Sequence, residues 1–228
     1  MTEKIAALVP MKGHSERVPN KNLREFNGRP LCHWILNTLR ATPEIDEVVV
    51  NTDADEIATE AEQFGATVLE RPEKLRGDYV SMNRIILHDV REVDADRYLQ
   101  THCTNPLLRP ESISDAIEAF RERECDSLFS VTPLRTRLWD ADGEPINHER
   151  DELKRTQDLP PVYEENSNVY LFTRESVERR KNRIGDDPAM FPIEASEAID
   201  IDEVIDFKTA ELFHRERYGE NPPLEAVV

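Results

Sequence analysis

Short apolar segments alternate along this chain with longer segments whose apolar residues recur at helical spacing. Residues 5–10 and 47–52 are short, apolar or β-branched, and bounded by polar residues, which is typical of buried strands. Between them, residues 31–39 carry apolar side chains on one helical face, and Pro30 suits the first turn of such a helix. This alternation predicts βαβ units, which place mostly parallel strands in one sheet with helices on both faces.

The same pattern continues over most of the 228 residues, a length that suits one sizeable domain. The predicted strands are residues 5–10, 47–52, 67–69, 98–101, 127–131, 169–172 and 199–201, and the predicted helices are residues 31–39, 55–64, 81–93, 110–123 and 206–217. We therefore predict a single α/β domain, 1–228, with a Rossmann-like sheet.

Residues 134–161 interrupt the alternation. The segment is polar, has little periodicity, and contains Asp142-Gly143, a pair typical of hairpin turns. We expect this excursion to leave the sheet as a small inserted hairpin. It would serve as a substrate lid or as a dimerisation arm.

The charge balance limits the possible partners. There are 47 acidic and 29 basic residues, a formal net charge of −18. Nucleic acids and anionic membranes both attract basic surfaces, so we expect neither as a partner. Acidic residues spread along the whole chain, with arginine preferred over lysine, favour a halophilic protein; the alternative is an ordinary acidic cytosolic protein.

Salt dependence separates these two interpretations. A halophilic protein carries mutually repelling carboxylates that salt screens, so its melting temperature should rise well into molar KCl. A melting temperature that stays flat in a KCl series would contradict the halophilic interpretation.

Cysteine content and terminal sequence indicate a cytoplasmic setting. Cys32, Cys103 and Cys125 share no metal-ligand spacing and are odd in number, which favours reduced thiols. The N-terminal residues do not resemble a signal peptide, and no stretch approaches the about 20 apolar residues of a membrane span.

A basic loop follows the first predicted strand. Lys12, Arg17 and Lys21 can together neutralise a triphosphate, and Gly13 would let backbone N–H groups approach it. The loop lacks the Walker A pattern, so it is not a P-loop. Residues 51–53 lie at the carboxyl end of a second predicted strand, and residues 102–106 follow a third. Because ligands of parallel sheets bind at the carboxyl ends of strands, we expect all three segments at one rim.

A pair of carboxylates lies near the other end of the chain. In an extended segment residues two apart face the same way, so Asp200 and Asp202 would converge on one point. Two carboxylates together with phosphate oxygens suit Mg²⁺. The alternative is an acidic turn without a ligand.

These segments belong to a longer series of short motifs that spans almost the whole chain. The matching positions are Lys12, Ser15, Pro19-Asn20-Lys21-Asn22-Leu23, Asn51-Thr52-Asp53, Arg71-Pro72-Glu73, Thr104-Asn105-Pro106-Leu107, Gln157-Asp158-Leu159-Pro160, Glu165-Asn166, Tyr170 and Ala198-Ile199-Asp200-Ile201-Asp202. In these motifs the chain resembles the acylneuraminate cytidylyltransferase family, which makes CMP-activated nonulosonic acids such as CMP-sialic acid.

The resemblance implies transfer of CMP from CTP to a keto-sugar acid with release of pyrophosphate, by a homodimer that uses Mg²⁺. Residues 134–161 resemble the family's dimerisation region. The implied roles are catalytic for Lys12, Lys21 and Asp202; nucleotide-binding for Lys12, Ser15, Lys21, Asn22, Arg71, Asp78 and Ser81; sugar-binding for His102, Gln157 and Tyr170; and metal-binding for Asp200 and Asp202. Two further sugar-binding candidates come from their placement: Gln100 on the strand before His102, and Arg155, whose charge could pair with the sugar carboxylate. Arg71 would otherwise be a surface ion pair, and Ser81 would otherwise cap its helix.

Four departures from the family pattern concern the acceptor more than the reaction. Lys12 replaces an arginine, which keeps the charge but loses bidentate geometry. His102 stands where the family has a glutamine linked with substrate recognition, and Gln100 lies two residues earlier on the same strand face. Thr156 and Ser167 replace an arginine and a glycine.

Three other functions remain open on the sequence. They are a nucleotidyltransferase for a different base or sugar, a glycosyltransferase with a D-x-D pair, and a non-catalytic nucleotide-binding protein. The D-x-D pair of a glycosyltransferase normally follows a mid-domain strand. The late position of Asp200 and Asp202 therefore favours a nucleotidyltransferase.

Overall fold

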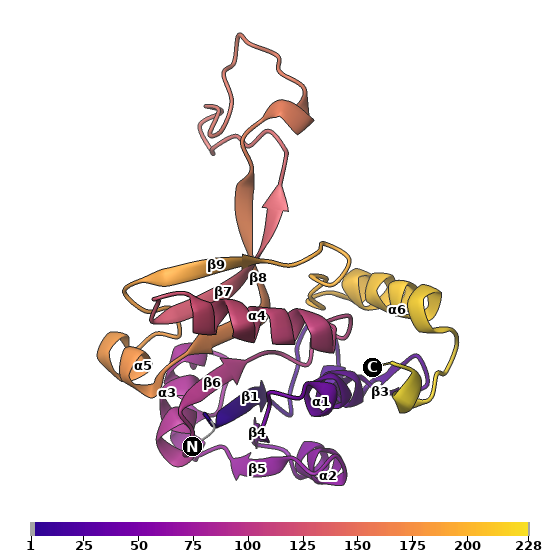
Figure 1. The fold of residues 1–228 in the computed structure, drawn as a ribbon. Coiled ribbons are helices and arrows are strands. Elements are labelled where there is room, and N and C mark those ends of the chain that lie inside the picture. The colour runs from indigo at the N-terminus through magenta and orange to yellow at the C-terminus, as the bar shows by residue number, and fades with distance from the viewer. Residues whose placement is uncertain (1–2, 228) are drawn as a thin grey trace.

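A seven-stranded sheet forms the centre of the computed structural model, which describes residues 3–227 (Figure 1). Its strands are β1 (Ile5–Met11), β4 (Glu47–Thr52), β5 (Thr67–Glu70), β6 (Arg97–Gln100), β7 (Ser127–Leu134), β8 (Val162–Phe172) and β9 (Pro188–Pro192), in the order β5-β4-β1-β6-β8-β7-β9. All neighbours pair in parallel except β8, which is antiparallel to both β6 and β7. The predicted mostly parallel sheet is confirmed.

Helices cover both faces of this sheet. They are α1 (Leu31–Ala41), α2 (Asp55–Gln63), α3 (Met82–Glu92), α4 (Pro110–Glu122), α5 (Arg174–Arg180) and α6 (Val204–Tyr218). Strand β1 supplies Ile5 and Val9 to the core shared with α1, α2, α4 and α6, and Ala6 and Leu8 to the core shared with α3 and α5. Burial on both faces explains why β1 is an uninterrupted apolar run.

Four short 3-10 helices and a two-stranded ribbon connect these elements. The 3-10 helices are η1 (Lys21–Leu23), η2 (Glu73–Leu75), η3 (Thr156–Asp158) and η4 (Leu224–Ala226), and the ribbon consists of β2 (Glu25–Phe26) and β3 (Arg29–Pro30). The ribbon leads the chain from the basic loop into α1, which begins directly after Pro30 as predicted.

The prediction that residues 199–201 form a strand is wrong. These residues belong to none of the described strands, and the edge of the sheet beside β7 is instead β9. Ile201 is fully buried and donates its N–H to the Thr104 carbonyl, which ties the segment to the loop after β6. The apolar side chains of the segment therefore reflect burial under the sheet rim rather than strand pairing.

The chain between β7 and β8 forms an arm that stands clear of the body (Figure 1). The two strands continue past the sheet as an antiparallel ribbon, and the predicted hairpin lies beyond it. Trp139 bridges to Pro145, the Asp140 carboxylate accepts from the N–H of Glu144, and Gly143 takes a φ of +81° in the turn. A positive φ favours glycine, so this turn explains the Asp142-Gly143 signal.

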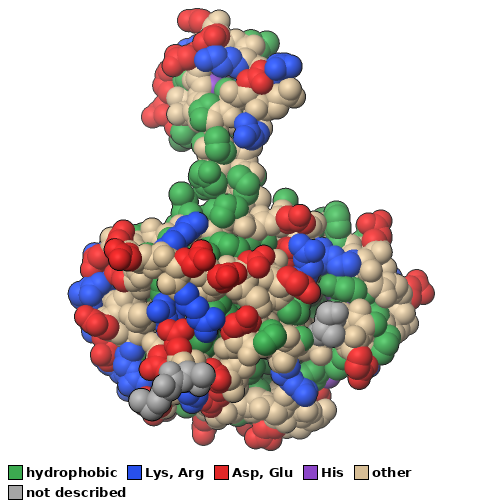
Figure 2. All heavy atoms as spheres, in the orientation of Figure 1, with side chains coloured by type: hydrophobic (Ala, Val, Ile, Leu, Met, Phe, Trp, Pro, Cys, Tyr) green, Lys and Arg blue, Asp and Glu red, His purple; other side chains and the backbone are tan. Residues whose placement is uncertain are grey.

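Acidic side chains lie on both the body and the arm, with arginines and lysines interspersed (Figure 2). This distribution is compatible with the halophilic interpretation, which stays a proposal for the KCl melting series to test. Among residues 3–227, none of the helices is both long enough and apolar enough to traverse a lipid bilayer.

Candidate active site

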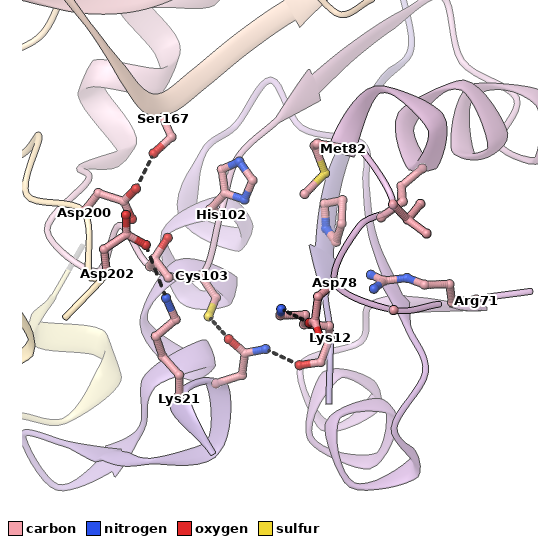
Figure 3. A pocket seen from close by; sticks show the side chains of 16 residues that line it. Lys12, Lys21, Arg71, Asp78, Met82, His102, Cys103, Ser167, Asp200 and Asp202 are labelled. Carbon is pink, nitrogen blue, oxygen red and sulfur yellow. Dashed lines mark hydrogen bonds and ion pairs between the residues drawn. The ribbon is translucent and has the colours of Figure 1, made fainter. Parts of the chain in front are cut away.

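A cavity of about 310 Å³ opens at the carboxyl ends of β1 and β6 (Figure 3). Lys12 follows β1 and His102 follows β6, and both side chains line the cavity. The distant segment that contains Asp200 and Asp202 completes the opposite wall. The structure therefore brings the basic loop and residues 102–104 to one rim, as the sequence predicted, and adds the acidic pair to it.

Lys12 and Asn22 shape the basic loop. The Lys12 Nζ donates to Asp78 Oδ1 at 2.7 Å, and this hydrogen bond lowers the pKa of Asp78 below its ordinary value. The Asn22 amide donates to the Lys12 carbonyl, and its oxygen accepts from the Cys103 thiol at 2.8 Å. The loop is thus fastened to the end of β6. A second hollow of about 230 Å³ adjoins it and contains Ser15, while sharing Lys12 and Asn22 with the main cavity.

Gly13 has a structural role that differs from the predicted one. Its N–H donates to Asp53 Oδ1 at 2.8 Å, so this N–H is occupied rather than open to phosphate. A Cβ at Gly13 would lie 2.7 Å from the Cβ of Ala54, closer than side chains pack. Glycine is needed here because the loop packs against the start of α2.

Lys21 lies between the basic loop and the acidic pair. Its side chain is only 14% exposed, its Nζ donates to the Ile201 carbonyl, and it lies 4.0 Å from Asp202 Oδ1. Arg17 also reaches this carboxylate, with 2.6 Å between Nη2 and Oδ1. Two cations from the first loop therefore hold a residue almost at the other end of the chain.

Asp200 has one satisfied and one unsatisfied oxygen. Its Oδ2 accepts from the Ser167 hydroxyl at 2.8 Å, whereas Oδ1 is buried without a hydrogen-bond partner among the described residues. Burial of Ile201 between Asp200 and Asp202 leaves both carboxylates on the cavity wall, although the extended strand assumed for them is absent.

This arrangement fits a magnesium ion better than a transition metal. Residues 3–227 contain no cluster of three or more His, Cys, Asp or Glu side chains placed to hold a metal. Mg²⁺ is commonly bound by one or two carboxylates together with substrate phosphates and water. Asp200 and Asp202 supply such a pair. Asp200 Oδ1 has no hydrogen-bond partner among the described residues, so this oxygen is available as a metal ligand.

The predicted nucleotide residues at the other wall differ in their placement. Arg71 lines the cavity but is 4% exposed, and its guanidinium donates to the side-chain and main-chain oxygens of Asn51 at 2.7 and 2.9 Å. The alternative of a surface ion pair is therefore wrong. Ser81 precedes α3 without forming a side-chain cap, and its neighbours Val80 and Met82 line the cavity in its place.

Of three predicted sugar-binding residues, one lines the cavity and two are buried behind it. His102 lines the cavity, whereas Gln100 is fully buried and Tyr170 is 1% exposed. Of His102 and Gln100, the two candidates for substrate recognition, His102 is therefore the one that lines the cavity. Burial, with the nearby charges of Arg183 and Lys21, lowers the pKa of His102 to about 3, so the imidazole is neutral near pH 7.

Arg155 and Gln157 lie on the arm and not at the cavity of the same chain. The Arg155 guanidinium pairs with Asp158 at 2.7 and 3.0 Å and is 73% exposed. The Gln157 carbonyl accepts from Arg135, another residue of the arm. Neither residue lines the cavity of its own chain, and their sugar-binding role stays a prediction.

Sequence reasoning gave no binding role to Ser167, Cys103 or Arg183. Ser167 is noticed in the sequence only as a departure from glycine, and its hydroxyl is what holds Asp200. Cys103 is inert as a nucleophile, since burial raises the pKa of its thiol well above the ordinary value. Arg183 follows α5 in a segment without a motif, so no pattern indicates its position behind His102.

Comparison with known proteins identifies the family. A family model described as cytidylyltransferase matches residues 6–218. N-acylneuraminate cytidylyltransferase of Oncorhynchus mykiss is 30% identical over 217 residues, covering 91% of this chain and 49% of that protein. CMP-N,N'-diacetyllegionaminic acid synthase of Legionella pneumophila is 29% identical over 222 residues, covering 91% and 95%. This chain thus spans about half the length of the Oncorhynchus mykiss relative and nearly all of the Legionella pneumophila one.

Solved structures share the fold. CMP:2-keto-3-deoxy-manno-octonic acid synthetase, complexed with CTP, superimposes with a TM-score of 0.74 at 14% identity, covering 93% of this chain and 99% of that one. A 4-diphosphocytidyl-2C-methyl-D-erythritol synthase from Anaerococcus prevotii superimposes with a TM-score of 0.68 at 16% identity, covering 93% of this chain and 96% of that one. At such identities the likeness concerns the fold alone, whereas the family model covers most of the sequence. The chain therefore belongs to the cytidylyltransferase family.

Proposed function

We propose that this protein transfers CMP from CTP to the anomeric hydroxyl of a nonulosonic, sialic-acid-like sugar acid and releases pyrophosphate. The observation that carries the proposal is the single cavity that Lys12, Lys21, Asp200 and Asp202 all line. Further support comes from relatives whose names describe the activation of acylneuraminic, pseudaminic and legionaminic acids with cytidylate.

The lysines have different tasks in this proposal. Lys12 is 45% exposed and paired with Asp78, so an incoming phosphate would replace Asp78 as its partner. Lys21 is largely buried and fixed by the Ile201 carbonyl, which places it to meet the phosphates without rearrangement. A cation that is already oriented stabilises the developing charge at little cost in reorganisation.

Asp200 and Asp202 would hold Mg²⁺. Ser167 fixes the Asp200 carboxylate through Oδ2, and Oδ1 is left to act as a ligand. When bound there, Mg²⁺ supplies Lewis-acid polarisation of the α-phosphate and lowers the pKa of the attacking sugar hydroxyl. The carboxylates would thus hold the ion beside Lys21, and the Lys21 ammonium would contact the phosphates directly.

No covalent intermediate is part of the proposal. The Cys103 thiol on the cavity wall donates a hydrogen bond to Asn22 Oδ1 and has a raised pKa, so it is a poor nucleophile at neutral pH. Direct attack of the sugar hydroxyl then depends on positioning of the two substrates and on charge stabilisation.

We infer a homodimer from the arm. Trp139, Ile146 and Leu153 are exposed apolar side chains on it, at 49%, 60% and 85%. Arg155 and Gln157 would reach a cavity only where the arm packs against a second copy. Sedimentation velocity checks this inference, because a particle of 26.4 kDa would be a monomer and would contradict it.

A pyrophosphate-release screen tests the function. Each of the four common nucleoside triphosphates is combined with Mg²⁺ and with sialic, legionaminic, pseudaminic or 3-deoxy-octulosonic acid. The expected result is release only with CTP and a nine-carbon acid. Release with another base or acid would indicate a different nucleotidyltransferase. Tight CTP binding without release in any mixture would indicate a non-catalytic nucleotide-binding protein.

A further inference from the structure

The side-chain amide of Gln100 has one possible orientation. Arg183 Nη1 lies 2.7 Å from the atom assigned as Gln100 Oε1. A guanidinium has only donors, so the atom that faces it must be the amide oxygen and not the amide nitrogen. The reversed amide would place two donors against each other in a fully buried position, where no water relieves the conflict.

This orientation determines which nitrogen of His102 carries the proton. The Gln100 Nε2 lies 2.9 Å from His102 Nε2, and its other hydrogen is directed to the Thr101 carbonyl at 3.1 Å. Because an amide NH₂ only donates, His102 Nε2 must be an unprotonated acceptor. A neutral imidazole then carries its proton on Nδ1.

Arg183 is itself held firmly. Its Nη2 donates to the Tyr170 hydroxyl at 2.9 Å, and that hydroxyl donates to Glu165 Oε1 at 2.5 Å. The guanidinium also lies over the Tyr170 ring, 3.6 Å from the ring centroid, and its side chain is 18% exposed. Arg183 therefore donates to both Gln100 and Tyr170, and the hydrogen bonds through Gln100 lead to His102 on the cavity wall.

The Nδ1 atom of His102 makes no hydrogen bond to any of residues 3–227, although His102 itself lines the cavity. A donor without a partner on the wall of a substrate cavity is placed to meet an acceptor of the substrate. An uncharged N–H suits a hydroxyl, carboxylate or acyl oxygen, all of which a sugar acid carries.

We propose that Arg183 is a positioning residue which, through Gln100, holds His102 as a neutral imidazole protonated on Nδ1, so that the cavity offers one N–H donor to an oxygen of the sugar acid. The inference rests on the proposed function for the identity of the ligand. The tautomer itself does not, and it can be measured without any substrate.

The tautomer is read from protein labelled with ¹⁵N in histidine, by long-range ¹H–¹⁵N correlation. His102→Ala identifies the signals of His102 by their loss. The wild type should show a protonated Nδ1 and a bare Nε2, and Arg183→Met should shift the ring toward a mixture of both tautomers. A wild-type ring protonated on Nε2, or an identical single tautomer in Arg183→Met, would overturn the inference whatever the enzyme's activity proves to be.

Kinetics test whether Arg183 acts through His102. Arg183→Met should lower kcat/KM for the sugar acid by about tenfold, the loss expected for one aligned hydrogen bond, with KM for CTP unchanged. The same substitution made in a His102→Ala background should cost less than about twofold, because coupled residues are non-additive. Equal losses in the two backgrounds would mean a merely structural role and would contradict the proposal.

Two further variants complete the experiment. Arg183→Lys keeps one donor toward Gln100 and should restore both the tautomer and most of kcat/KM; if Arg183→Met does not fold, this variant and the wild-type tautomer decide the matter. Arg91→Met removes an exposed arginine that pairs with Glu178, away from His102, and it should change neither measurement. Failure of every sugar acid to react would contradict the proposed function while leaving the spectroscopic result valid.

Discussion

Lys21→Ala is expected to lower kcat for pyrophosphate release by about 10²–10³-fold, the range seen when one preorganised donor to a developing anion is removed. Lys21 is largely buried and is held by the Ile201 carbonyl, close to the Asp202 carboxylate. Its loss removes a largely buried cation from beside the acidic wall and leaves the Asp202 carboxylate with less compensation. Steady-state release of pyrophosphate from CTP and the accepted sugar acid measures the effect.

Two lysine variants serve as references for this prediction. Lys12→Ala should cost less than Lys21→Ala, because Lys12 is more exposed and already shares its charge with Asp78. Lys74→Ala removes an exposed lysine of η2 and should leave the rate unchanged. If Lys21→Ala behaves like Lys74→Ala, the assignment of Lys21 to the phosphates is wrong.

Asp200→Asn is expected to reduce kcat by about a hundredfold or more and to raise the Mg²⁺ concentration needed for half-maximal rate. Asparagine keeps the acceptor oxygen for Ser167 and nearly the same volume, so the change removes mainly the charge. The expected size follows from a metal contribution of several kcal/mol, with about 1.4 kcal/mol for each tenfold in rate. Titration of the rate with MgCl₂ gives both quantities.

Ser167→Ala provides a graded comparison, since it leaves the carboxylate but removes the hydroxyl that orients it. Loss of such an orienting group typically weakens metal affinity by about 10–100-fold. Asp115→Asn, at an exposed position on α4, should have no effect on either quantity. A normal rate and normal Mg²⁺ dependence in Asp200→Asn would remove Asp200 from the metal site.

Much of the fold follows from periodicity because burial on two faces leaves a strong sequence pattern. β1 is apolar throughout for that reason, and the Pro30 signal marks the start of α1 correctly. The sequence pattern predicts neither α5 nor β9. α5 is a seven-residue, mostly charged helix begun by a Thr173 cap, and β9 is an edge strand flanked by prolines with few buried side chains. Both depend on tertiary packing more than on local preference.

The candidate site was predictable where residue type alone indicates chemistry. Lysines and carboxylates at strand ends indicate phosphate and metal whatever the local backbone, so Asp200 and Asp202 reach the cavity although their predicted strand is absent. Residue type does not predict how deeply a side chain is buried. Gln100 and Tyr170 read as binding residues, yet both are buried at paired positions of the central strands β6 and β8, behind His102. Arg183 completes that layer from a segment with no signal.

The central claim is that CMP becomes attached to the sugar acid in this cavity. Phosphorus NMR of the wild-type protein with CTP, Mg²⁺ and the accepted acid tests it directly, because phosphodiester, free CMP and pyrophosphate give separate signals. We predict equal amounts of a CMP-sugar phosphodiester and pyrophosphate, both absent without the acid. CTP that stays intact with every acid, or pyrophosphate accompanied by free CMP alone from the start of the reaction, would contradict the account.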